Sequence, residues 1–479
     1  AGAGLGQPVA AVGTRALLAL VPGSLPRADD VAMDARVVLA TLGVSLLAGA
    51  AFGLLAALRA GAPALVGGLQ GLRATAGAAR QTARRTLVAA QVALSLVLLV
   101  GAGLLAQSFW RLQRVDPGFA PEGAMTAGVL MPIADFDQRR DGPRWARALG
   151  AYDARLRATP GVAAAGGASG LPLSGATETG SFVIEGAPAS APGQGPSADY
   201  VVMTPGYLDA MRIPLLAGRG FDAHDDADAP LVVLVSQAAA RRYWPGRSPI
   251  GARLYVFGDQ PRTVIGVVGD VRQLALDVPP NPTIYLPEAQ YPYPFLSFVV
   301  RAACPRPADG CDAGALVPAM RQALAEVDPQ LALDEVRPLH DVLRESLARR
   351  RFSLVVLGAF AAAALVLSVV GLYGVIAYAV AQRTRELGVR VALGAQRGDV
   401  LRLVLGEGVR VTLAGLVVGL AGALALTRVL RAQLYQVSPT SPAVYVVVAL
   451  LVAAVALAAT WIPARRATRV PPTLALRAE

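Results

Sequence analysis

Residues 352–380 have the sequence F-S-L-V-V-L-G-A-F-A-A-A-A-L-V-L-S-V-V-G-L-Y-G-V-I-A-Y-A-V, and none of these 29 side chains is charged. A helix needs roughly 20 apolar residues to cross the hydrocarbon core of a bilayer, so this stretch predicts a membrane span. At about 1.5 Å per residue the helix exceeds a core roughly 30 Å thick. We therefore expect its outer end to form part of a stalk with the helix that precedes Arg111.

Other apolar stretches on both sides of it predict a helical membrane bundle. Val37–Leu58, Leu87–Trp110 and Ala443–Ile462 are also uncharged and long enough to span. Val411–Thr427 is shorter, but a mostly apolar region that contains Glu407 extends it, and we predict it as a further span.

The composition fits a membrane protein and excludes several kinds of chemistry. The 479 residues are 54% hydrophobic and 16% charged, against about 25% charged in an ordinary soluble domain. All 44 basic residues are arginines. Without lysine, neither a P-loop nor a Schiff-base site can be built from these residues. Two histidines and two cysteines are too few for a zinc site made of those ligands alone.

Arginine gathers on one side of the predicted spans. If Leu87–Trp110 runs outward, the three inner segments (59–86, 381–410 and 463–479) carry a net charge of +11. The large segment Arg111–Arg351 has 24 arginines and 26 acids, a net charge of −2. Cytoplasmic loops hold the excess of arginine, so Arg111–Arg351 is predicted to face outward. A nucleic-acid-binding protein would carry basic clusters on its folded domain, and the distribution excludes that class.

The beginning of the chain resembles its end. Both parts contain T-R-x-L, a proline-containing turn, an apolar span and a closing Arg-Ala pair, at Arg59-Ala60 and at Arg466-Ala467. We expect residues 1–60 to be the last two helices of a preceding, truncated membrane module, so that the chain begins inside a larger protein. A chance similarity between alanine- and leucine-rich helices is the alternative.

The segment Arg111–Arg351 contains both strand patterns and helix patterns. Short β-branched or aromatic runs predict strands at Leu231–Val235, Thr263–Val268, Thr283–Leu286 and Ser297–Val300. Helical periodicity predicts helices at Arg144–Ala158, Gln237–Tyr243, Ala315–Val327 and Leu339–Arg350. These elements together predict an α+β domain.

Cys304 and Cys311 lie in a Pro/Gly-containing loop of this outward domain. An oxidising compartment favours pairing, and a short loop can bring the two Cα atoms within disulfide range. We predict a disulfide; two unpaired thiols are the alternative.

The acidic stretch Phe221–Asp228, F-D-A-H-D-D-A-D, has oxygen ligands that suit a divalent cation. Its spacing does not match an EF-hand, and a solvated loop is the favoured interpretation, so we predict no metal site and no cofactor. His224 and His340 each have an adjacent aspartate, but no G-x-S-x-G elbow accompanies them. We expect no catalytic triad.

The inner stretch Gln382–Glu407 is basic and partly amphipathic. Glu386 and Arg390 are four residues apart and can pair on one helical face. Such an element suits the docking of a partner protein; a basic loop that only fixes the membrane orientation is the alternative.

The order of one span, a large outer domain and three spans resembles the FtsX/MacB-type permeases of ABC systems. R-T-R-E-L-G-V-R-V-A-L-G-A at Arg383–Ala395 follows the second span. In the outer domain, Pro205-Gly206-Tyr207, Tyr243-Trp244-Pro245-Gly246 and Val264–Val271 are similar to the MacB-type periplasmic core domain. The resemblance covers roughly residues 80–479, and the preceding 60 residues make the chain similar to the C-terminal module of a duplicated permease.

The resemblance implies a membrane α-helical bundle, with about four spans in the complete module and about two from a preceding one, and a large α+β periplasmic domain. The expected domains are the truncated module (1–60), a basic cytoplasmic linker (61–86), a transmembrane helix (87–110), a MacB-like periplasmic core domain (111–351) and an FtsX-like permease domain with three spans (352–479).

In such permeases an ATPase on the cytoplasmic face moves the helices, and the motion is relayed to the periplasmic domain. The resemblance implies a bacterial inner-membrane location, a cytoplasmic ABC ATPase as partner, a periplasmic adaptor or outer-membrane duct, and a pairing of permease modules. It places six residues in or beside the ATPase contact: Arg383, Arg385, Glu386, Gly388, Arg390 and Gly394. MacB carries its own ATPase domain, and these 479 residues contain none, so we expect this chain not to be an enzyme.

Two other functions remain open. An FtsX-like signalling or scaffold protein would regulate a periplasmic partner, such as a cell-wall hydrolase, without moving a substrate. A periplasmic enzyme on membrane anchors would need His224 or His340 for activity.

Overall fold

The structure is a computed structural model that describes residues 43, 71–130, 137–175, 177–188, 191, 195–303, 312–383, 390, 393, 396–431 and 434–467. The chain forms two compact units. The helical unit comprises Ala1–Gln113 and Ala348–Glu479, and the sheet unit comprises Arg114–Leu347.

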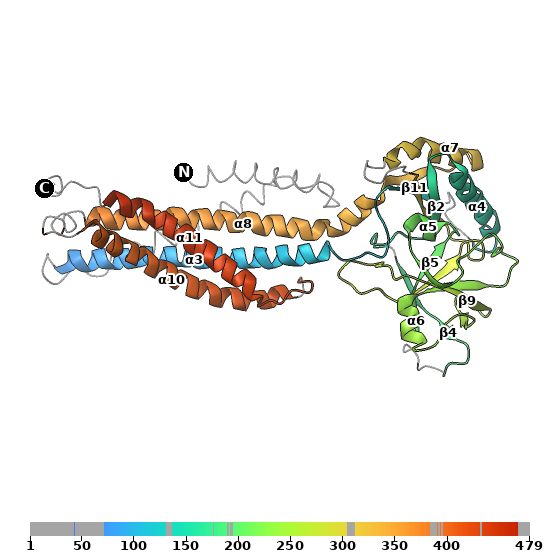
Figure 1. Ribbon diagram of the computed structural model, residues 1–479, viewed down its shortest axis with the longest axis horizontal. Helices are drawn as coiled ribbons and strands as arrows, with labels where there is room; N and C mark the ends of the chain where they lie inside the picture. The colour runs from blue at the N-terminus through green and yellow to red at the C-terminus, as the bar shows by residue number, and fades with distance from the viewer. Residues whose placement is uncertain are drawn as a thin grey trace. The chain divides into compact units, whose positions relative to one another are not determined.

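The part of the chain that the structure describes contains four helices that are long and apolar enough to cross a membrane. They are α3 (Gly71–Leu112), α8 (Leu339–Gln382), α10 (Arg397–Leu430) and α11 (Pro442–Ala467) (Figure 1). The predicted fold class, a membrane helical bundle with an α+β domain, is confirmed. α3 begins at Gly71, so much of the segment expected to be a linker is helical. The expected span Val37–Leu58, Gly43 apart, lies outside the described residues.

α3 is the most enclosed of the four spans. Its most apolar stretch is 44% buried, against 11% for that of α8. Val92, Leu96, Val100 and Leu104 are at most 1% exposed and recur every four residues, so they form one buried stripe on the helix. The other three helices pack around α3 in a single apolar core.

α10 approaches α3 closely through glycines. A Cβ at Gly415 would lie 2.7 Å from Val92 Cβ and 2.8 Å from the Ala89 carbonyl oxygen, and a Cβ at Gly419 would lie 3.0 Å from Ala93. Small residues at four-residue spacing let two membrane helices approach to backbone contact. The α3–α10 interface therefore depends on the absence of side chains at Gly415 and Gly419.

The sheet unit is built on a mixed sheet of twelve strands in the described residues, with the order β12-β1-β11-β2-β5-β10-β7-β9-β8-β4, while β3 pairs with β5 and β6 with β9. Its strands are β1 (Ala124–Leu130), β2 (Val162–Ala168), β3 (Glu178–Ser181), β4 (Val183–Ile184), β5 (Ser197–Met203), β6 (Leu215–Gly218), β7 (Val232–Ser236), β8 (Arg253–Tyr255), β9 (Pro261–Val268), β10 (Thr283–Pro287), β11 (Phe295–Ala302) and β12 (Leu333–Pro338). β5 and β10 run parallel, as do β7 and β9, and the other pairs are antiparallel.

Helices cover two parts of this sheet. α4 (Gly142–Ala158) and α7 (Val317–Val327) pack together over β11 and β2 around a core that contains Tyr152 and Phe298 (Figure 1). α6 (Gln237–Tyr243) lies at the other part of the sheet, beside β7 and β9, over a second core cluster. α5 (Tyr207–Met211) and the 3₁₀ turn Ala313–Leu316 complete the unit.

The four predicted strands are present as β7, β9, β10 and β11, and the four predicted helices as α4, α6, α7 and the start of α8. The sequence did not predict β2, whose residues V-A-A-A-G-G-A have low strand propensity. β2 forms because it lies between β11 and β5 and because its glycines allow close packing. A Cβ at Gly166 would lie 2.1 Å from the Tyr207 backbone nitrogen.

Candidate functional site

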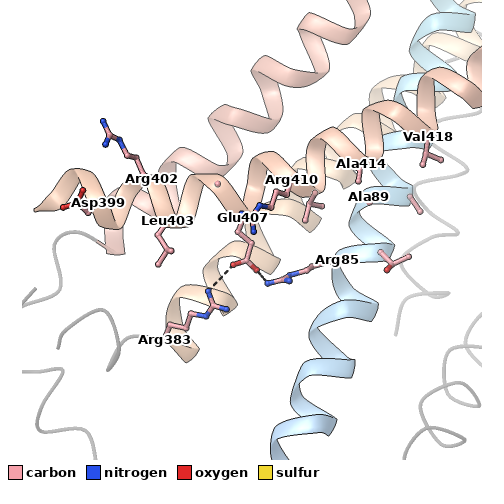
Figure 2. Close-up of a pocket in the computed structure, with 14 residues that line it drawn as sticks. Arg85, Ala89, Arg383, Asp399, Arg402, Leu403, Glu407, Arg410, Ala414 and Val418 are labelled. Carbon is pink, nitrogen blue, oxygen red and sulfur yellow. Dashed lines mark hydrogen bonds and ion pairs between the residues drawn. The ribbon is translucent and has the colours of Figure 1, made fainter. Parts of the chain in front are cut away.

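Glu407 of α10 connects three helices at the arginine-rich end of the helical unit. Its carboxylate accepts a hydrogen bond from Arg85 of α3. Its Oε2 lies 3.6 Å from Nη1 of Arg383, the residue that follows α8. The Glu407 side chain is 14% exposed, so a single, mostly buried carboxylate holds two guanidinium groups from different helices (Figure 2).

Aromatic contacts reinforce this end of the unit. The guanidinium carbon of Arg84 lies 4.3 Å from the centre of the Tyr378 ring, which joins α3 to α8 through a cation–π interaction. Arg466 of α11 donates a hydrogen bond of 3.1 Å to the hydroxyl of Tyr373 on α8. All four spans are therefore linked by arginine contacts at the same end.

A cavity of about 950 Å³ opens beside Glu407. Figure 2 shows the face of α10 that lines it, with Leu403, Glu407, Ala414 and Val418 at spacings of four or seven positions. Ala89 of α3 also lines the cavity. Four arginines and two acids contribute to its wall: Arg85, Arg383, Arg402, Arg410, Asp399 and Glu407. The wall is therefore cationic at one end and apolar toward Val418.

α10 begins at a capped turn. The Gln396 side chain and the Asp399 side chain bond reciprocally to each other's backbone groups in a capping box, and the Gln396 backbone nitrogen donates to Asp399 Oδ2 over 3.1 Å. A box of this kind satisfies backbone donors that have no partner within the helix. It fixes where α10 starts, ten residues before Glu407.

The structure describes only part of the predicted coupling loop. Arg383 lies in the cavity wall, and the exposed Arg390 lies on helical backbone. Arg385, Glu386, Gly388 and Gly394 lie outside the described residues, so the proposed Glu386–Arg390 pair stays a prediction.

The other sequence candidates all belong to the outward domain. Cys304 and Cys311 lie outside the described residues, and their disulfide stays a prediction. The side chain of His224 is 94% exposed and its Nδ1 lies 3.0 Å from Asp222. His340 is half-exposed beside Asp341. The interpretation of Phe221–Asp228 as a solvated loop is wrong for Asp225, which is buried and paired with Arg219.

Sequence reasoning noted Glu407 only as an interruption of an apolar stretch and did not connect it with Arg85. The available signal was the position of one acid at the inner end of a predicted span, next to a segment in which arginines outnumber acids. An acidic group at such a depth needs a partner, but the sequence does not reveal which of several arginines supplies it.

Two protein-family models match this chain. The FtsX-like permease C-terminal model matches residues 358–472, and the MacB-like periplasmic core domain model matches residues 90–323. The chain belongs to the FtsX/MacB-type permeases. This permease is thus a membrane protein, and its sheet unit is a periplasmic domain of the MacB type.

Curated relatives of this permease are export proteins. The pyoverdine export ATP-binding/permease protein PvdT of Pseudomonas putida is 28% identical over 287 residues, which cover 57% of this chain and 42% of that protein. The macrolide export ATP-binding/permease protein MacB of Rhodospirillum rubrum is 29% identical over 294 residues, with the same coverage of 57% and 42%. The match spans only about two fifths of the length of these relatives.

The crystal structure of the periplasmic region of MacB from Actinobacillus actinomycetemcomitans is also similar to part of this permease. The match covers 49% of this chain and 96% of that chain, at 14% identity and a TM-score of 0.31.

Proposed function

We propose that this permease transmits ATP-driven motion from a separate cytoplasmic ATPase to its periplasmic domain, in the bacterial inner membrane, and so supports the export or extraction of a substrate. The observation that carries the proposal is the position of Arg383. It follows α8 directly, begins the predicted coupling loop, and contacts Glu407 of α10, which also binds Arg85 of α3. A force applied to the loop therefore acts on three spans through one carboxylate.

The ATPase is proposed as a partner chain. A P-loop needs a lysine on the β- and γ-phosphates, and the 479 residues contain no lysine. The relatives PvdT and MacB are named ATP-binding/permease proteins, which supports a role together with ATP hydrolysis. We expect the purified chain alone to hydrolyse no ATP.

Affinity purification of the full-length chain from its native membrane tests this proposal. We expect an ABC ATPase to co-purify, and we expect Arg383→Gln to reduce its recovery and its stimulated ATP hydrolysis at least threefold. Arg428→Gln is the matched control, because Arg428 is an exposed arginine near the other end of α10. Unchanged recovery of an ATPase with Arg383→Gln would contradict the coupling role.

The co-purifying periplasmic proteins separate export from regulation. An adaptor or an outer-membrane duct protein supports export. A cell-wall hydrolase in their place, with no change of substrate efflux on deletion of the gene, would favour the signalling function.

A further inference from the structure

The sheet unit contains an acidic cavity that the proposed coupling function does not use. Its volume is about 700 Å³, within the usual range for small-molecule sites. It is bounded by α4, β2, the turn at Thr204–Gly206, the loop after Phe221 and the end of β10. Six carboxyl groups and one arginine line it: Asp153, Asp209, Asp222, Asp225, Asp226, Glu288 and Arg157.

Glu288 is the unusual member of this set. It directly follows β10, and its backbone nitrogen donates to the Met203 carbonyl oxygen over 3.0 Å. The residue is 3% exposed, and its Oε1 is buried without a hydrogen-bond partner among the described residues. Buried polar atoms in native proteins are almost always paired, with a protein group, water or a ligand. Oε1 therefore lacks a hydrogen-bond partner in a residue that lines the cavity wall.

Two of the other acids are buried and paired with arginine. Asp153 Oδ2 lies 2.6 Å from Arg157 and its Oδ1 accepts a hydrogen bond of 3.2 Å from Thr204. Asp225 binds Arg219 through both of its oxygens, at 2.7 and 2.8 Å. Arg157 and Arg219 are thus engaged, and neither neutralises Glu288 by a direct contact.

The remaining acids are more open to solvent. Asp209 and Asp226 are exposed, and the Asp222 side chain is 50% exposed. An approaching cation would meet these carboxylates at the accessible part of the wall, with Glu288 at the buried part. Apolar side chains also line the cavity, including those of Ala154, Phe221 and Ala289.

We propose that this cavity binds an organic cation, an amine with an apolar body, whose ammonium group donates a hydrogen bond to Glu288. A metal ion fits less well, since the described residues contain no group of three or more His, Cys, Asp or Glu side chains placed to hold one. An ammonium group supplies the donors that a lone carboxylate oxygen needs, and the apolar wall suits a hydrocarbon body.

Binding of the organic cation is coupled to the release of a proton from Glu288. Burial, with a smaller contribution from the charge of Asp153, raises the pKa of Glu288 to about 8, so the carboxyl is largely protonated at pH 7. A bound ammonium favours the ionised form and lowers this pKa, so one proton leaves Glu288. The charged groups facing it are those of the cavity wall named above, from α4, α5 and the loop after Phe221.

Calorimetry of the full chain in detergent tests the site with benzylamine, and with benzyl alcohol as its neutral counterpart. We expect benzylamine to bind at least tenfold more tightly than the alcohol. At pH 7, repeated titrations in buffers of different ionisation enthalpy are expected to show proton release. Equal binding of the two probes would overturn the proposal.

Glu288→Gln keeps the shape of the protonated carboxyl but cannot ionise. We expect it to weaken benzylamine binding at least tenfold and to remove the proton release. Glu326→Gln, on the exposed side of α7, is the matched control and leaves both unchanged. Asp209→Asn, at an exposed position that cannot disturb the core, is expected to weaken binding two- to threefold. Unchanged affinity in both Glu288→Gln and Asp209→Asn would overturn the proposal.

Discussion

Glu407 and Arg85 are 322 positions apart in the sequence and hydrogen-bonded in the structure. The contact joins α10 to α3, and the same carboxylate lies beside Arg383 at the end of α8. Loss of Glu407 therefore removes contacts to α3 and to the end of α8 together, whereas loss of either arginine leaves the contact with the other in place.

Glu407→Gln is expected to destabilise the helical unit by about 1 kcal/mol, since both arginines are partly exposed and such pairs contribute little more. Arg85→Gln is expected to cost less, because Arg383 stays with the carboxylate. Thermal unfolding of the detergent-solubilised chain measures both. Glu345→Gln is the control, since it removes an exposed pair with Arg337; an equal effect from this control would contradict the role of Glu407.

Gly415→Ala is expected to destabilise the α3–α10 interface by about 1–3 kcal/mol, the usual cost of overpacking. The new methyl group would lie 2.8 Å from the Ala89 carbonyl oxygen, which belongs to the backbone and cannot rotate away. Gly406→Ala, on the same helix, has no atom within 4 Å of the new Cβ and is expected to be neutral or slightly stabilising. Thermal stability in detergent compares them, and equal stabilities would refute this packing account.

The stability of the sheet unit is expected to depend on pH through Glu288. Its pKa rises from 4.5 to about 8 in the folded chain, so folding favours the protonated carboxyl. The stabilisation that comes from the protonated carboxyl is complete below about pH 4.5 and is lost as the pH rises through 8. The free energy of unfolding falls by up to about 1.4 kcal/mol per pH unit over this range. Glu288→Gln is expected to remove it, so the variant gains stability relative to the parent chain between pH 5 and 8.

Tryptophan fluorescence measures this difference. Trp145 and Trp244 are buried in the sheet unit, at 3% and 7% exposure. The other two tryptophans, Trp110 and Trp461, are replaced by phenylalanine so that only the sheet unit is observed. Parallel stability curves for Glu288→Gln and its parent across this pH range would show that Glu288 is not the responsible group.

Arg301→Gln is expected to destabilise the sheet unit by about 1–3 kcal/mol, the usual cost of leaving buried polar groups unpaired. Arg301 is 4% exposed and donates to the carbonyl oxygens of Ala210, Glu122 and Ala120 over 2.8, 2.5 and 2.5 Å. Glutamine has too few donors and too short a reach for three carbonyls. Chemical denaturation measures the loss, and Arg321→Gln, an exposed arginine of α7, is the control with no expected effect.

Local patterns were enough to predict the spans and about half of the sheet unit's elements. Residues 352–380 and 87–110 are apolar over a length that only a membrane helix uses, and runs such as Thr263–Val268 are β-branched within themselves. The local pattern missed β2, which is stabilised by β11 and β5 on its two sides. Its own side chains carry little strand preference.

Composition and neighbouring residues were enough to predict that the chain crosses a membrane, which side of its spans is rich in arginine, and that no P-loop lysine is present. The contacts of Glu407 with Arg85 and Arg383, and the cavity that Glu288 shares with Asp153 and the loop after Phe221, became known from the folded chain. They could not be predicted because a charge acts on whatever lies within a few ångströms of it, and packing brings together residues tens to hundreds of positions apart.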